Sequence, residues 1–181
     1  MSIISFIESI DRSIFLEINL DFQNRFFDLL FPFLRDFTFV FWIGFIIYLI
    51  IKKEKKLALL MAAGIIAGAI LTFPVKYFFE RERPYEQIDS ARLIAPTEFD
   101  PSFPSGHTEM SFLAATIASK FHPEYSKYLY GFSIVVALSR IYVGVHFPID
   151  TIGGVIIGIL TGRLMLMLAK RRKSIFWEER I

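Results

Sequence analysis

Long uncharged stretches, each ended by charged residues, set the pattern of this chain. Residues 57–75 form a run of 19 residues without a charge, close to the ~20 residues that cross ~30 Å of hydrocarbon as a helix. Residues 37–51 form a second uncharged run. Helical spans are therefore predicted in five places, which are 37–51, 57–79, 105–120, 127–141 and 148–169. The pattern predicts an all-α, integral-membrane helical bundle.

The segment before the first span has a different pattern. Residues 2–21 set isoleucine and phenylalanine side chains against Glu8, Asp11 and Arg12, which favours a helix lying in the membrane interface over a span. The charges and the lack of a basic leader argue against a cleaved signal peptide. Residues 26–34 are apolar but contain Asp28 and Pro32, so they are predicted to lead into the first span at an angle.

Composition agrees with a membrane protein of one domain. Hydrophobic residues make up 54% of the 181 residues and charged residues 21%, less charge than a soluble domain of this size carries. We expect one domain over 1–181, with 1–36 as an amphipathic lead-in and 37–173 as the bundle. Because the chain has no cysteine, disulfides and thiolate metal sites are excluded.

Basic residues predict how the bundle is oriented. Lysines at 52–56, Lys120, Lys127 and the cluster at 170–173 all lie on one side under alternating threading. That side should be cytoplasmic. The polar segment 80–103 and the turn between the last two spans then face outward, so we expect a cytoplasmic (inner) membrane protein whose site faces the periplasm or the cell exterior.

Three clusters of polar residues lie at the outward ends of the predicted spans. Charges at membrane depth cost roughly 2.5 to 3.5 kcal/mol each, so they usually have a partner or a function. The threading places all three clusters at one level. They are Lys76, Arg81, Arg83 and Pro84; then Pro104, Ser105, Gly106 and His107; then Ser139, Arg140, His146 and Asp150.

The cationic members of these clusters suit a phosphate group. Lys76, Arg83 and Arg140 supply three fixed positive charges, and arginine adds paired donors. Ser105 and the amide of Gly106 lie at a predicted helix N-terminus, where backbone N–H groups favour an anion. These five residues are the candidate phosphate ligands.

The histidines add the groups that a phosphoryl transfer needs. His107 and His146 can divide the roles of nucleophile or base and of acid. Asp150, four residues after His146, can hold one imidazole nitrogen and leave the other free to attack, and we expect it to raise the pKa of His146. Because no carboxylates and histidines stand at metal-ligand spacing, we expect neither a metal nor a cofactor.

Each of these residues also has a purely structural interpretation. Lys76 could extend from its span to water, Ser105 could only cap a helix, and Asp150 could only stabilise the helix that follows it. Glu109 could contact the site or pair with an arginine. Glycines spaced four apart, such as Gly64 and Gly68, could pack inside the bundle or form a homodimer face. The presence of all the clusters on one face favours a site.

At this point the sequence resembles the type 2 phosphatidic acid phosphatase superfamily of membrane phosphatases. Its three motifs occur in order: K-x6-R-P from Lys76 to Pro84, P-S-G-H at 104–107, and S-R-x5-H-x3-D from Ser139 to Asp150. The resemblance implies a catalytic helical bundle with five to six transmembrane helices, in which the first 36 residues could take the place of a sixth span.

The resemblance also implies a role for each residue. His146 would attack phosphorus and form a phosphohistidine, with Asp150 orienting it. His107 would protonate the departing lipid oxygen and then activate water. The remaining residues would stabilise the equatorial oxygens; they are Lys76, Arg83, Ser105, Gly106 and Arg140.

Together these observations predict a metal-independent lipid phosphatase. The substrates that the resemblance implies are undecaprenyl pyrophosphate, phosphatidylglycerol phosphate, phosphatidic acid and lipid A 1-phosphate. A lipid phosphotransferase would need the same residues, and a non-enzymatic transporter would need broken helices at mid-membrane. The expected partners are the lipid substrate and the bilayer, with no nucleic acid and no obligate protein partner.

Overall fold

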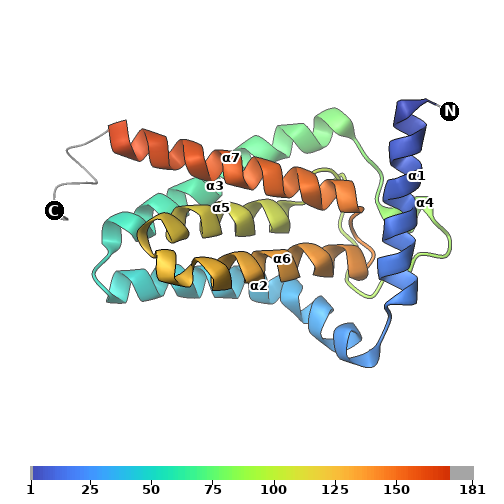
Figure 1. Ribbon diagram of the computed structural model, residues 1–181, viewed down its shortest axis with the longest axis horizontal. Coiled ribbons are helices and arrows are strands. Elements are labelled where there is room, and N and C mark those ends of the chain that lie inside the picture. Colours follow the sequence, from blue (N-terminus) through green and yellow to red (C-terminus); the bar gives the residue numbers. More distant parts are fainter. Residues whose placement is uncertain (1, 172–181) are drawn as a thin grey trace.

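The structure, a computed structural model, describes residues 2–171 (Figure 1). These residues form helices and connecting loops, without a strand, which confirms the all-α prediction. A π-helical turn, Glu17–Asp21, follows the first helix, and a 3-10 turn, Pro123–Tyr125, precedes the sixth. The α-helices are α1 (Ile3–Leu16), α2 (Arg25–Ile51), α3 (Lys55–Phe79), α4 (Pro84–Gln87), α5 (Gly106–Phe121), α6 (Ser126–Tyr142) and α7 (Pro148–Arg171).

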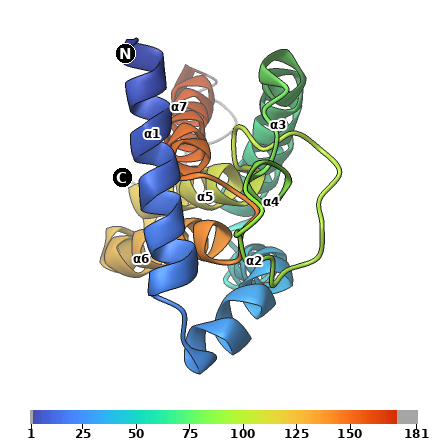
Figure 2. The same cartoon turned by 90° about the vertical axis from the view of Figure 1, so that its right-hand side faces the viewer.

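Helix α5 forms the centre of the bundle. In the end-on view of Figure 2, α2, α3, α6 and α7 surround it, and its residues 108–118 are all buried. Glycines allow this close packing: a Cβ at Gly158 of α7 would lie 2.4 Å from the Glu109 carbonyl oxygen, and one at Gly64 of α3 would lie 2.8 Å from the Ile117 side chain. Gly64 and Gly158 therefore pack inside the bundle, which is the first of the two roles considered for glycines spaced four apart.

Helix α2 is longer than the predicted span. It begins at Arg25, after Asn24 whose side chain accepts a hydrogen bond from the Phe27 amide at 3.0 Å. Pro32 lies inside it, and its first turns run at an angle to the rest (Figure 1), as expected for a helix that contains proline. Residues 26–34 thus lead into the first span at an angle, as predicted, and they do so within one continuous helix.

Within residues 2–171, three helical stretches are long and apolar enough to cross a membrane. They cover Arg25–Ile51, Lys55–Gln87 and Pro148–Arg171, whereas α5 and α6 have 16 and 17 residues. Large apolar side chains cover the outer surface of the three long helices, among them Val40, Ile43, Ile66, Ile70, Ile156 and Leu160. Such a surface suits hydrocarbon and not water, so the protein is an integral membrane protein.

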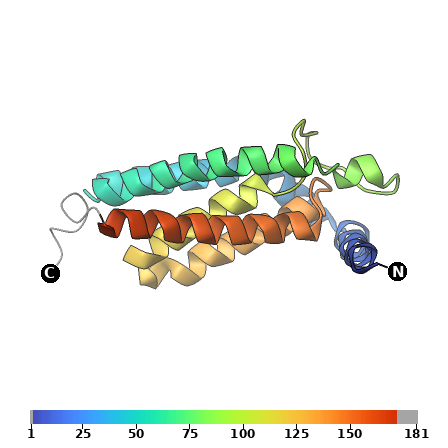
Figure 3. The same ribbon diagram turned by 90° about the horizontal axis from the view of Figure 1, so that it is seen from above.

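Helix α1 lies outside this bundle and crosses one of its ends (Figures 1 and 3). Isoleucine and phenylalanine side chains project from it, including Ile3, Ile4 and Phe6, while Asp11 and Phe15 are buried against the bundle. This arrangement fits the predicted interfacial helix. Residues 172 and 173, the last of the predicted bundle and of its basic cluster, lie outside the described residues.

Candidate active site

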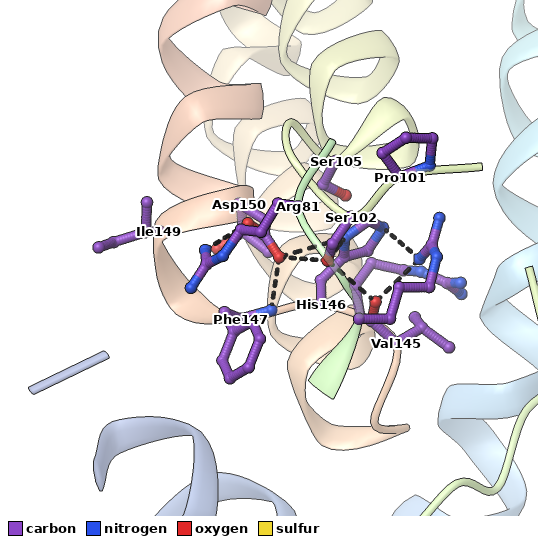
Figure 4. A network of polar contacts seen from close by, with 12 residues as sticks. Arg81, Pro101, Ser102, Ser105, Val145, His146, Phe147, Ile149 and Asp150 are labelled. Atoms are coloured by element: carbon purple, nitrogen blue, oxygen red, sulfur yellow. Dashed lines mark hydrogen bonds and ion pairs between the residues drawn. The ribbon is translucent and has the colours of Figure 1, made fainter. Parts of the chain in front are cut away.

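The three polar clusters of the sequence meet at the end of the bundle that α1 crosses. They come from the C-terminus of α3, the N-terminus of α5 and the turn between α6 and α7 (Figure 4). Gly144 makes that turn possible, since its φ is +91° and a Cβ there would lie 2.1 Å from the Arg92 carbonyl oxygen. The His146 amide then donates to the Arg140 carbonyl at 3.2 Å, which fixes the imidazole in the interior.

His146 faces Asp150 on one side and the cations on the other. Its Nδ1 lies 3.6 Å from Asp150 Oδ2, and Ser102 joins the two: the Ser102 hydroxyl donates to Asp150 Oδ2 at 2.5 Å and lies 3.3 Å from His146 Nδ1 (Figure 4). Nε2, the other ring nitrogen, lies 3.5 Å from Arg83 Nη1 and 3.8 Å from Glu98 Oε2. The attacking nitrogen would therefore be Nε2, pointing at the cation cluster.

The pKa of His146 differs from the sequence expectation. Burial lowers it to about 4, because the hydrogen bond to Asp150, which acts in the opposite direction, is outweighed by burial and by the charge of Arg83. Asp150 acts in the expected direction and raises the pKa of His146, but burial has the larger effect and the pKa lies below its ordinary value. The imidazole is consequently neutral at neutral pH, as a nucleophile requires.

Asp150 is held from several directions. Its Oδ2 accepts from the Phe147 amide at 2.8 Å, and its Oδ1 pairs with Arg81 at 2.6 Å. Arg81 in turn pairs with Asp11 of α1 at 2.5 Å, and Asp11 accepts from the Ile149 amide at 2.8 Å. A continuous polar chain thus runs from the N-terminal helix to the candidate catalytic pair, which the sequence did not predict.

The predicted phosphate-binding cations hold two carboxylates from the loop before α5. Arg83 pairs with Glu98 and with Asp100, each at 2.8 Å. Arg140 pairs with Glu98 at 2.5 Å and Lys76 pairs with Asp100 at 3.1 Å. The structure therefore brings the three cations together as predicted, and it adds two acidic partners that the sequence did not single out.

Both carboxylates are ionised at neutral pH. Burial tends to raise the pKa of Glu98, but the charges of Arg140, His146 and Arg83 outweigh it and leave the pKa below its ordinary value. The pKa of Asp100 is lowered in the same way by Lys76. The cation cluster thus binds anions, and in this structure the bound anions are the carboxylates of Glu98 and Asp100.

The start of α5 brings His107 to the same place. The Ser105 amide donates to the Asp150 carbonyl at 3.0 Å, and the Ser105 hydroxyl accepts from Thr108 at 3.0 Å instead of capping the helix. His107 Nε2 is buried and has no hydrogen-bond partner within residues 2–171, and the Phe39 ring packs against the imidazole with centroids 5.1 Å apart. An unpartnered ring nitrogen is available for a proton transfer.

A cavity of about 580 Å³ connects these groups. Four candidate site residues line it, namely Lys76, Gly106, His107 and His146. Of the other four, Arg83 and Asp150 contact His146, Arg140 pairs with Glu98, and Ser105 bonds to Asp150. Glu109 also lines the cavity and has no arginine partner among the described residues. Within residues 2–171 no three histidine or acidic side chains are arranged to hold a metal ion; a metal-free reaction stays a prediction.

The fold and the site together define a class, an integral membrane protein whose helical bundle places a histidine–aspartate pair beside an anion site. The sequence matches the model of the PAP2 superfamily over residues 57–174. The chain belongs to this superfamily, which confirms the resemblance drawn from the three motifs.

Several relatives of the chain are named as lipid phosphatases. The chain is 30% identical to an undecaprenyl-diphosphatase of Sulfolobus acidocaldarius over 61% of its own length and 54% of that protein, so it spans only about half of that relative. It is 28% identical to the lipid A 4'-phosphatase of Porphyromonas gingivalis over 88% of its length and 73% of that protein. The crystal structure of LpxE from Aquifex aeolicus superposes with a TM-score of 0.76 at 30% identity, covering 86% of this chain and 93% of that one.

Proposed function

We propose that this protein is a metal-independent lipid phosphatase that works through a phosphohistidine on His146. One observation carries the proposal: a neutral, buried imidazole presents Nε2 to a cluster of three cations that already binds two carboxylates. A phosphate that replaced Glu98 and Asp100 would lie against Nε2. The superfamily and two relatives, one named an undecaprenyl-diphosphatase and the other a lipid A 4'-phosphatase, support the same conclusion.

In the first half of the reaction, Nε2 of His146 forms a bond to phosphorus while the bond from phosphorus to the lipid oxygen breaks. Asp150 and Ser102 hold Nδ1, so the lone pair on Nε2 stays directed at the phosphate. His107 gives a proton to the departing oxygen. Lys76, with the two arginines of the cluster, stabilises the charge on the equatorial oxygens of the transition state.

In the second half, water replaces the histidine. His107, now neutral, takes a proton from the water, whose oxygen forms a bond to phosphorus as the bond to His146 Nε2 breaks. Inorganic phosphate leaves, and His107 is again protonated. Each proton and each phosphoryl oxygen is accounted for by the lipid, the water and the two histidines.

We also propose that the site faces outward from the cytoplasmic membrane and takes lipids of the outer leaflet. The candidate active site lies at one end of the bundle, and the basic residues of the α2–α3 turn and of the end of α7 lie at the other (Figure 1). Cytoplasmic ends of membrane helices carry such an excess of lysine and arginine. Undecaprenyl diphosphate, phosphatidylglycerol phosphate, phosphatidic acid and lipid A phosphate are the candidate substrates, and residues 1–181 act as one domain.

The test is phosphate release by the purified protein from those four lipids, with the His146→Ala variant beside it. Loss of the nucleophile should abolish turnover of every substrate. The matched control is His122→Gln, since His122 pairs with Glu54 and Glu124 at the far end of the bundle, and it should keep the wild-type rate. EDTA should leave the rate within about threefold. Full activity of His146→Ala, or activity that depends on added magnesium, would overturn the mechanism.

A further inference from the structure

Arg35 of α2 is a cation of the cavity wall that belongs to none of the three motifs. It is half-buried and lines the cavity together with Lys76, His107 and His146. Among the described residues no carboxylate pairs with it. Every other cation of the site has such a partner, namely Lys76, Arg81, Arg83 and Arg140.

Helix α2 places Arg35 on the His107 side of the cavity. Phe39 packs against the His107 imidazole, and Arg35 precedes Phe39 by four residues, so both lie on one face of the helix. Both side chains line the cavity. The charge of Arg35 acts on His107 and also on Arg140, which places the guanidinium near the anion site and not at a distant surface.

The His107 side is where the leaving group would lie. In the proposed reaction His107 protonates the departing oxygen, so the part of the substrate that keeps this oxygen must be adjacent to it. A free guanidinium at that position suits a leaving group that is itself an anion. A lipid diphosphate supplies one, because its terminal phosphate is transferred and its inner phosphate stays with the lipid.

We propose that Arg35 binds the inner phosphate of a lipid diphosphate, and that this site is therefore built for lipid diphosphates over monophosphates. This inference rests on the proposed function. The bond from the terminal phosphorus to the bridging oxygen breaks as Nε2 of His146 bonds to that phosphorus. The bridging oxygen takes its proton from His107, and the product is a lipid monophosphate held by Arg35.

Besides Glu98 and Asp100, two acidic residues line the same cavity, and they do not oppose this assignment. Glu109 Oε1 lies against α3, 2.2 Å from where a Cβ of Gly68 would be, and Gly68 is eight residues, about 12 Å of helix, before Lys76. Glu109 is thus deeper in the bundle than the anion site. Asp36 is exposed, forms no ion pair with its neighbour Arg35, and provides a matched control.

The experiment compares farnesyl diphosphate with farnesyl phosphate, two substrates that differ only in the second phosphate. Replacing Arg35 by methionine should lower kcat/KM for the diphosphate by about tenfold to a hundredfold, the effect of losing a charge-assisted hydrogen bond. It should change kcat/KM for the monophosphate by less than about threefold. Arg35→Lys should recover part of the diphosphate activity, and Asp36→Asn should not reduce it.

The two substrates also distinguish the possible failures. Activity of Arg35→Met on the monophosphate shows that the variant is folded, so a selective loss on the diphosphate supports the assignment. Equal losses on both substrates, or no loss on either, would overturn the role of Arg35 while leaving the phosphatase intact. If the wild-type protein releases phosphate from neither substrate nor from the four membrane lipids, the proposed function itself fails.

Discussion

Neutralising Glu98 should make the enzyme bind phosphate more tightly. Glu98 bonds to Arg83 at 2.8 Å and to Arg140 at 2.5 Å, with a side chain only 12% exposed, so substrate must displace it before reaching the cations. Charge-assisted hydrogen bonds contribute about 1.5 to 3 kcal/mol each. The bonds that the incoming phosphate forms with the arginines offset most of the free energy lost when Glu98 leaves. If the part that is not offset equals one charge-assisted hydrogen bond, Glu98→Gln should lower KM about tenfold.

Steady-state kinetics and thermal unfolding in detergent test this expectation together. KM and the inhibition constant of vanadate should both fall about tenfold, with kcat changed by less than about threefold. Without ligand, Arg140 would be left buried with no carboxylate partner, so the variant should lose about 3 kcal/mol of stability, and orthophosphate should restore it. Glu124→Gln, an exposed carboxylate at the far end of the bundle, is the control. A higher KM with weaker vanadate inhibition would show that Glu98 helps to bind substrate.

Three further outcomes are expected. Because the lowered pKa of His146, about 4, keeps the imidazole neutral at any higher pH, kcat/KM should fall in acid near pH 4 to 5. An acidic limb near pH ~6.5, the ordinary value for histidine, would contradict this assignment. Asp11→Asn removes the charge that holds Arg81 on Asp150, so it should lower kcat about tenfold with KM unchanged. Asp11→Glu should recover part of the rate. An unchanged kcat in Asp11→Asn would show that α1 has no positioning role. In intact cells, cysteine at Ser90 should react with an impermeant thiol reagent and cysteine at Ser126 should not, and the reverse pattern would invert the proposed orientation.

The bundle could be predicted from the sequence because the bilayer demands long apolar runs and the basic residues gather at their ends. That the first span begins as early as Arg25, in one continuous helix, could not be predicted. Asp28 and Pro32 have the pattern of a break, yet Asp28 pairs with Arg92 at 2.7 Å and accepts from the Tyr142 hydroxyl at 2.7 Å. These partners are 64 and 114 residues away in the chain, so no local pattern predicts that a helix tolerates the charge.

The candidate site also has one part that the sequence predicts and another part that it does not. Cations and histidines in motifs at helix ends could be predicted to converge, since each motif fixes both a residue and its depth. Their partners could not: Ser102, Glu98 and Asp100 come from a loop whose path depends on tertiary contacts. Asp11 had the pattern of a solvated position on an amphipathic helix, and only its pairing with Arg81, 70 residues away, explains its burial.

The walls of the cavity determine how a lipid would arrive. Much of its apolar lining comes from two neighbouring membrane helices, with Phe39 on α2 and Ile65, Ala69 and Phe73 on α3. A head group entering between these helices keeps its hydrocarbon tails in the bilayer, so the encounter is a search in two dimensions. The rate should then follow the mole fraction of substrate in the membrane, and added inert lipid should slow turnover by surface dilution even when the bulk concentration of substrate is constant. A soluble anion such as vanadate enters from water and should escape that dilution.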